Sequence, residues 1–182
     1  MASLQIDPAT AADVPVILQL IRELAEFERL LDQVTANEEQ LRLGLFGPRP
    51  SAEVIMARLQ PGGEVVGFAL YFHNFSTFLA KPGIYLEDLY VRQKFRGQGF
   101  GEALLRHLAQ IALKRDCGRL EWSVLDWNHR AVDFYKSLGA APMDEWTTYR
   151  VSGAALDRLG QSVDQSIDLG AAIDSADRTD RK

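Results

Sequence analysis

The sequence predicts an α/β fold whose elements follow the order β-α-α-β-β-β-α-β-α-β. Short runs of β-branched and aromatic residues alternate along the chain with longer runs that carry apolar residues at helical spacing. A glycine-rich hexapeptide at residues 96–101 joins one strand-like run to one helix-like run. With 182 residues, of which about half are apolar, the chain is expected to form one domain.

The N-terminal segment predicts a strand and a long helix. Residues 4–7 form the strand, and residues 10–13 (Thr-Ala-Ala-Asp) resemble a capping box that starts the helix. The helix is expected to run to about Arg29. Its apolar stripe consists of Val16, Leu20, Leu24 and Phe27.

A second helix and a hairpin are predicted next. Thr35 and Glu38 have capping-box spacing, which indicates a helix that continues through Leu43 and stops before the Gly-Pro-Arg-Pro break at 47–50. Strands at 53–59 and 64–72 then form a hairpin across Pro61-Gly62-Gly63.

The rest of the sheet is predicted from three apolar runs, at 84–91, 120–124 and 147–151. A helix follows the first run, with its apolar residues spaced between Ala103 and Ala112. Another helix spans 130–138 and stops at Gly139. Residues 161–182 contain no aromatic residue and few large aliphatic ones, so a polar, disordered tail is expected after a domain at 1–160.

The hexapeptide Arg96-Gly97-Gln98-Gly99-Phe100-Gly101 has the setting of an anion cradle. Glycines leave backbone N–H groups open to close approach, and a helix N-terminus carries partial positive charge. No Gly-Lys-Ser/Thr follows, so the loop is not a Walker A motif, and residue 102 is Glu where a dinucleotide fingerprint needs Gly. A pyrophosphate is the predicted ligand; a plain glycine-rich connection is the alternative.

Several motifs resemble a known family. The hexapeptide fits Arg/Gln-x-x-Gly-x-Gly/Ala, the acetyl-CoA loop of the GNAT superfamily of N-acetyltransferases, and the segment 127–140 resembles its second cofactor segment. Further motifs are similar to the diamine (spermidine/spermine) acetyltransferases, over residues 1 to about 150. They are residues 7–13, Leu20-Ile21, Glu23-Leu24, Phe27-Glu28, Tyr85-Leu86-Glu87-Asp88, Phe134-Tyr135-Lys136 and Trp146.

The resemblance implies a GNAT fold, with a central mixed, mostly antiparallel sheet flanked by helices, and acetyl-CoA as cosubstrate. The pantetheine arm would pair with the strand carrying Leu89, Tyr90 and Val91, where a backbone N–H would hold the oxyanion. Asn128 would contact the cofactor, although a helix N-cap is its structural alternative. The implied cofactor-binding residues are Leu89, Tyr90, Val91, Arg96, Gly97, Gln98, Gly99, Phe100, Gly101, Asn128 and Tyr135.

Acetyl transfer needs a base and an acid. Only a neutral amine attacks, and Glu87 is the candidate that accepts its proton through water, because it interrupts an apolar strand. Strict alternation would place Glu87 on one face with Tyr85 and Leu89, and Asp88 on the other. Tyr135 is the candidate acid for the departing thiolate, with a core tyrosine as its alternative. An acetyl-enzyme formed on Cys117 is the rival mechanism, but Arg115 and Asp116 give no clear thiolate activation and no histidine is adjacent, so an inert cysteine at a helix end is the alternative.

The acceptor site implied by the resemblance is acidic. It consists of Phe27, Glu28, Glu87, Asp88, Glu145 and Trp146, with Asp144 beside the last two. Ser76-Thr77-Phe78 stands where the polyamine enzymes carry an Asp and a Trp, which weakens the case for a long polycation. Diamines, polyamines and thialysine-like amino acids stay open as acceptors. Acetylation of a protein or peptide amine, and a non-catalytic CoA-binding protein, are the alternative functions.

Composition restricts the partners. A net charge of −5 gives no electrostatic support for nucleic-acid binding. No apolar run has the length of a membrane span, and a single cysteine with no export signal predicts a cytoplasmic protein. The three histidines, His73, His107 and His129, lack metal-ligand spacing. The family resemblance implies a homodimer.

Overall fold

The computed structural model describes residues 3–161, which fall into two units divided between Val132 and Asp133. The first unit holds a five-stranded sheet: β1 (Ser3–Pro8), β2 (Glu53–Gln60), β3 (Glu64–Ser76), β4 (Lys81–Val91) and β5 (Leu120–Trp122). It also holds the helices α1 (Val14–Glu28), α2 (Glu38–Phe46) and α3 (Phe100–Lys114). Helix α4 (His129–Ser137) crosses the boundary, and α5 (Ala154–Gln161) belongs to the second unit.

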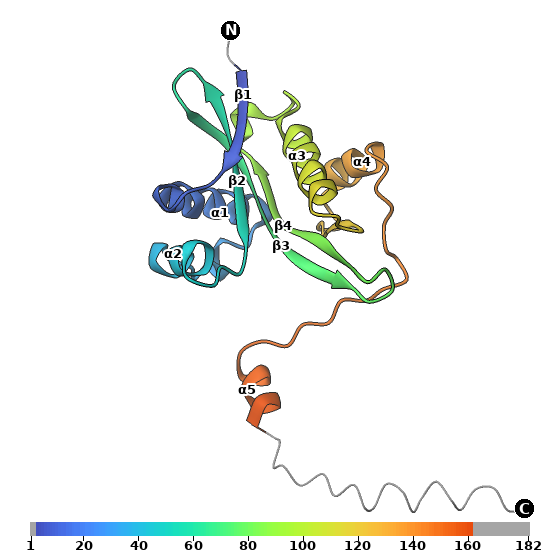
Figure 1. Ribbon diagram of the computed structural model, residues 1–182. Coiled ribbons are helices and arrows are strands. Elements are labelled where there is room, and N and C mark those ends of the chain that lie inside the picture. The colour runs from blue at the N-terminus through green and yellow to red at the C-terminus, as the bar shows by residue number, and fades with distance from the viewer. Residues whose placement is uncertain (1–2, 162–182) are drawn as a thin grey trace, which may run out of the picture. The chain divides into compact units, whose positions relative to one another are not determined.

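The strands lie in the order β1-β2-β3-β4-β5. The first four pair antiparallel, and β5 pairs parallel to β4, with Ile84 beside Leu120. Helices α1 and α2 cover one face of the sheet and α3 covers the other (Figure 1). The expected mixed, mostly antiparallel sheet flanked by helices is therefore confirmed.

Each face of the sheet has its own core. On the α1 face, Ile17 and Leu20 pack with the sheet residues Val54, Met56, Phe68 and Tyr90. On the other face, α3 buries Leu104, Leu105, Leu108 and Ala112, which recur at helical spacing as the sequence predicts. Burial of two apolar stripes against one sheet fixes where the ends of β4, α1 and α3 meet.

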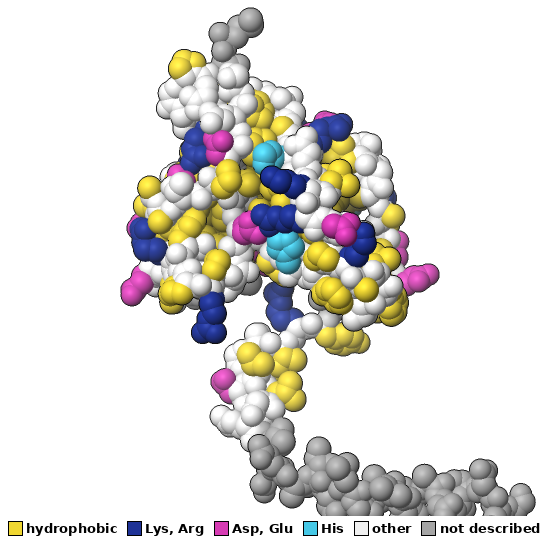
Figure 2. Space-filling model, viewed as in Figure 1, with side chains coloured by type: hydrophobic (Ala, Val, Ile, Leu, Met, Phe, Trp, Pro, Cys, Tyr) yellow, Lys and Arg dark blue, Asp and Glu magenta, His cyan; other side chains and the backbone are white. Residues whose placement is uncertain are grey.

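A polar cluster attaches the C-terminal end of α3 to the sheet. Arg115 donates two hydrogen bonds to Glu53, at 2.5 and 2.8 Å, and Tyr71 donates a third to the same carboxylate. His73 Nε2 lies 3.3 Å from Arg115 Nη1. Burial and the Glu53 carboxylate raise the pKa of Tyr71 to about 12, so its phenol stays a donor at neutral pH. Figure 2 shows histidine, basic and acidic side chains gathered near the middle of one face.

Two sequence predictions need correction. The second helix begins at Glu38 and ends at Phe46, and its capping box is formed by Asn37 and Gln40 in place of Thr35 and Glu38. The Asn37 carboxamide accepts from the N–H of Gln40 at 2.9 Å, a bond that Thr35 lies too far upstream to make.

The strand expected at 147–151 is wrong. These residues have no strand partner among residues 3–161, and the side chain of Tyr149 is 91% exposed. A β-branched and aromatic run forms a strand only where a neighbour satisfies its backbone groups. The structure instead has α5 at 154–161, which the sequence analysis missed. The tail expected to be disordered lies, from residue 162 on, outside the described residues.

No helix in the described part of the chain is long and apolar enough to cross a membrane.

The corrected cap of α2 can be tested by substitution. Asn37→Ala should lower the free energy of unfolding by about 1 kcal/mol, because it removes the acceptor for an unpaired helix N–H. Thr35→Ala, two residues away, is the matched control and should change stability by less than about 0.5 kcal/mol. Urea unfolding measures both; equal losses would contradict the assigned cap.

Candidate functional site

The glycine hexapeptide forms an open turn between β4 and α3. It follows the single-turn helix η3 (Gln93–Phe95), and Gly99 is the N-cap of α3. Gly97 has φ 80° and Gly99 has φ 82°, a region that residues with a Cβ rarely adopt. A Cβ added at either position would meet no atom within 4 Å, so the space beside both is open. The turn thus presents backbone N–H groups and a helix N-terminus to an unobstructed volume.

The Arg96 side chain lies between two aromatic rings. Its guanidinium carbon is 4.3 Å from the Phe27 ring centroid and 5.4 Å from that of Tyr90, and its Nε donates to the carbonyl of Val91 at 3.0 Å. Phe27 in turn packs against Trp127, with centroids 5.9 Å apart. This aromatic–arginine stack, formed by Tyr90, Arg96, Phe27 and Trp127, joins α1 to the glycine turn by cation–π contacts.

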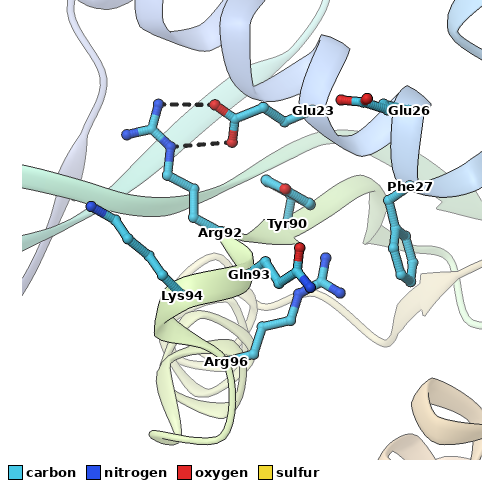
Figure 3. A pocket seen from close by; sticks show the side chains of 8 residues that line it. All are labelled: Glu23, Glu26, Phe27, Tyr90, Arg92, Gln93, Lys94 and Arg96. Atoms are coloured by element: carbon cyan, nitrogen blue, oxygen red, sulfur yellow. Dashed lines mark hydrogen bonds and ion pairs between the residues drawn. The ribbon is translucent and has the colours of Figure 1, made fainter.

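A pocket opens beside the aromatic–arginine stack (Figure 3). Helix α1 contributes Glu23, Glu26 and Phe27, and the opposite wall is made by Tyr90, Arg92, Gln93, Lys94 and Arg96. Arg92 is already paired with Glu23 through two contacts of 3.2 Å, and Lys94 with Glu64 at 2.6 Å. Arg96 makes no ion pair with a carboxylate of the described residues, which leaves it as the cation available to a bound anion.

Strand β4 carries a β-bulge at the two predicted acids. Leu86 is opposite Tyr71 and Asp88 is opposite Leu70, so Glu87 has no residue opposite it on β3. The extra residue exchanges the faces of the strand beyond it. The expectation of strict alternation is therefore wrong: Tyr85 and Leu89, four residues apart, are opposite Phe72 and Ala69, which lie on different faces.

The bulge places Asp88 on the α1 face, together with Tyr90. Its side chain is partly buried, whereas Glu87 is exposed. Burial, followed by repulsion from Glu87 and Glu28, raises the pKa of Asp88 to about 6. Burial also raises the pKa of Glu28, the last residue of α1. Glu28 and Glu87 thus both act on Asp88, and we call these three residues the acid cluster. A cation bound there would offset the repulsion of Asp88 by its neighbours.

Beyond the bulge, β4 loses its second neighbour. Strand β5 pairs with β4 only from Ile84 to Leu86. Among residues 3–161, no strand pairs with the edge of β4 that Leu89, Tyr90 and Val91 present on the β5 side. Unpaired backbone groups on such an edge can accept an extended ligand as an added strand.

The remaining predicted residues fall in two places. Asn128 ends a turn before α4, where its Oδ1 accepts from the N–H of Ala131 at 3.3 Å, so its N-cap role is present. Tyr135, Glu145 and Trp146 belong to the second unit, and the Trp146 side chain is 71% exposed.

The structure gives no support to a covalent route through Cys117. This partly buried cysteine follows the C-terminal end of α3, whereas the glycine turn precedes its N-terminus. Fifteen residues of helix separate the two by roughly 22 Å. Within the described residues, no group of three His, Cys, Asp or Glu side chains is placed to hold a metal ion.

Sequence reasoning missed two features of this region. The cation–π contacts of Arg96 could not be read from the chain, because Phe27 and Arg96 are distant in sequence. It also missed a polar cluster on β5, where Glu121 lies 2.8 Å from both Asn74 Nδ2 and Arg119 Nε. The alternation of Arg119, Glu121 and Ser123 with apolar residues indicates a polar face on this strand, and it was the sequence signal for the cluster.

Comparison with known proteins agrees with this geometry. The sequence profile described as the Acetyltransferase (GNAT) family matches residues 18–140. The chain is 44% identical over 168 residues to the thialysine N-epsilon-acetyltransferase of Bos taurus, in a match that covers 87% of this chain and 98% of that protein. It is 34% identical over 194 residues to an L-ornithine N5-acetyltransferase of Arabidopsis thaliana, covering 83% and 85%.

A solved structure is similar over the same length. An integron cassette protein of V. cholerae superposes with a TM-score of 0.74 at 31% identity, covering 88% of this chain and 99% of that one. The profile match spans more than half of the chain, and the relatives are matched over more than four fifths of it. The chain therefore belongs to the GNAT family of acetyltransferases.

Proposed function

We propose that this protein transfers the acetyl group of acetyl-CoA to the primary amine of a small cationic acceptor, by direct attack in a ternary complex. One observation carries the proposal: a single strand, β4, has an unpaired edge that leads into an anion cradle and a cluster of acids on the α1 face. The relatives named for thialysine and ornithine acetylation support a small amine as the acceptor.

The cofactor would lie along the end of β4. Its pantetheine arm pairs with Leu89, Tyr90 and Val91, and its pyrophosphate binds the N–H groups from Gly97 to Gly101. Arg96 adds the positive charge, since its guanidinium has no carboxylate partner among the described residues. A backbone N–H of β4 faces the oxyanion that forms when the amine attacks the thioester. Asn128 contributes a further polar contact.

The acceptor would enter the acid cluster as an ammonium ion. Its reference pKa is near ~10.4, so it must lose a proton before it attacks. Glu87, exposed on the bulge, accepts that proton through water, and Asp88 with Glu28 attracts the cation. The family resemblance assigns Phe27, Glu145 and Trp146 to the acceptor site as well. Tyr135 protonates the departing thiolate.

Two parts of the proposal rest on the family resemblance and the sequence. The protein is proposed to act as a homodimer. The lone Cys117, which is partly buried and not in a disulfide, fits the proposed cytoplasmic location.

The activity is tested by following the free thiol of CoA with a panel of amines. We expect release with acetyl-CoA and diamines or basic amino acids, and background release without an amine. Calorimetric binding of acetyl-CoA with no release for any amine would identify a non-catalytic CoA-binding protein. Release with peptide amines alone would favour the other alternative.

Glu87→Gln tests the base. Gln keeps the size of the side chain but loses its charge and basicity, so kcat should fall by about 10²–10⁴-fold at pH 7, and acceptor affinity should fall as well. Raising the pH should restore kcat, because more of the amine arrives neutral, whereas the affinity should not return. A pH profile of kcat like that of the parent would assign the base elsewhere.

Asp88→Asn tests the acid cluster through stability. Because the folded protein holds the Asp88 proton more tightly than the unfolded chain does, parent stability falls as pH rises from about 4 to about 6 and stays lower above. The substitution removes this cost. The free energy of unfolding of the variant should therefore exceed that of the parent by about 2–3 kcal/mol at pH 7, a gain that vanishes below about pH 4.

The matched control for that experiment is Asp126→Asn, an exposed carboxylate of the same unit. Thermal unfolding at pH 4 and pH 7 compares the two variants. An Asp88→Asn gain at pH 4 equal to that at pH 7, or the same gain in the control, would contradict the repulsive cluster.

A further inference from the structure

A second polar cluster lies on the same face of the sheet as Asp88, farther back along β4. Asn74 of β3 is opposite Gly83 of β4, and its Nδ2 donates to Glu121 Oε2 of β5 at 2.8 Å. Arg119 Nε lies 2.8 Å from the same oxygen. We call Asn74, Arg119 and Glu121 the distal cluster.

Gly83 is what allows these side chains to meet. A Cβ at this position would come within 2.3 Å of Asn74 Oδ1 and 2.9 Å of Arg119 Cγ. Real Cβ atoms do not approach other atoms that closely, so the amide and the arginine stem occupy the space where a side chain would otherwise stand. The three side chains therefore cross the sheet directly over β4.

The distal cluster is not satisfied internally. Asn74 Oδ1 and Arg119 Nε are buried and have no well-directed hydrogen-bond partner among the described residues, even though Arg119 Nε is close to Glu121. The side chains of Arg119 and Glu121 keep 37% and 33% of their surface exposed. A structural ion pair usually saturates its donors, whereas this one leaves a guanidinium and a carboxylate accessible side by side.

Between the distal cluster and the acid cluster, the face of β4 is aromatic and polar. Tyr85 is in register with Glu121, packs on Phe72 with centroids 5.2 Å apart, and shares a 2.8 Å hydrogen bond with Ser123. All of these side chains are at least partly exposed. They form a continuous row that leads from Glu121 toward Asp88.

The distance between Glu121 and Asp88 fits a short molecule that is charged at both ends. Tyr85, in register with Glu121, precedes Asp88 by three residues, or roughly 10 Å at about 3.3 Å per residue. Five single bonds of about 1.5 Å, the number between the α-carbon and the terminal amine of lysine, span roughly 6 Å when extended. The side chains of Arg119 and Glu121 at one end, and of Glu87 at the other, cover the remaining distance.

We infer that Arg119 and Glu121 are specificity residues that bind the α-carboxylate and α-ammonium of a basic amino acid whose side-chain amine is acetylated near Glu87. The inference rests on the proposed function and names its acceptor class. Arg119 donates two parallel hydrogen bonds to the carboxylate. Glu121, which accepts a hydrogen bond from Asn74, accepts another from the α-ammonium. A diamine has no group to pair with Arg119, which repels its distal ammonium.

The experiment compares acceptors that differ only in the carboxylate: lysine with 1,5-diaminopentane, and S-aminoethyl-cysteine with the diamine that lacks its carboxylate. For the parent, kcat/KM should be at least about tenfold higher for each amino acid than for its matched diamine, because the diamine lacks the charge-assisted contact with Arg119. Arg119→Gln should raise KM for the amino acids about tenfold or more. It should leave kcat, the KM for acetyl-CoA and the KM for the diamines within about twofold.

Two further variants separate recognition from structure. Arg119→Lys keeps the charge and the aliphatic stem over Gly83 and should recover part of the amino-acid affinity. Arg106→Gln removes an exposed arginine that pairs with Glu102 on α3. It should change the KM of neither the amino acids nor the diamines.

Failure of the inference is distinct from failure of the proposed function. If the parent acetylates the diamines as well as the amino acids, or if Arg119→Gln and Arg119→Lys raise KM equally for both classes, the distal cluster is structural and the inference is overturned while the acetyltransferase activity stands. If no amine in either class releases CoA, the proposed function itself fails.

Discussion

The arrangement of the site depends on the pairing of β4. This strand has an antiparallel neighbour, β3, along its whole length and a parallel neighbour, β5, only at its first half. The bulge at Glu87 falls where the second neighbour ends. It turns Asp88 toward α1 and leaves the last residues of β4 with one open edge. A regular, fully paired strand would have neither the acid cluster nor an open edge.

The acids gathered at the bulge act against folding stability. Glu87 and Glu28 both repel the partly buried Asp88 carboxylate, and the raised pKa of Asp88 reflects its burial together with that repulsion. Such charges persist in a folded protein where they bind something, since an apolar or neutral group would fit with less free-energy cost. In the proposed function an ammonium ligand supplies the missing opposite charge, which would couple acceptor binding and local stability through the same carboxylates.

Arg96 connects the glycine turn with α1. Its guanidinium contacts the rings of Phe27 of α1 and Tyr90 of β4, and it belongs to the glycine turn that is proposed to bind the pyrophosphate. Movement of Arg96 toward a phosphate would release Phe27, which also contacts Trp127. The same side chains therefore link the glycine turn to the end of α1. The distal cluster lies at the opposite end of this row, where β3, β4 and β5 are still paired.

The sequence by itself determined the order of the elements along the chain as far as α4, three of the four predicted helices closely, and the motifs of the site. Hydrophobic period, glycine spacing and capping residues are local signals, and α1, α3 and the turn at 96–101 follow from them. The register of β4 with β3 was decided only by the tertiary structure, and with it the faces of Glu87 and Asp88. The same holds for the absence of a strand at 147–151 in the described part of the chain, for the stack around Arg96 and for the distal cluster. Each of these depends on which distant residue a side chain or backbone group meets, and contacts between distant segments are not encoded in a local pattern.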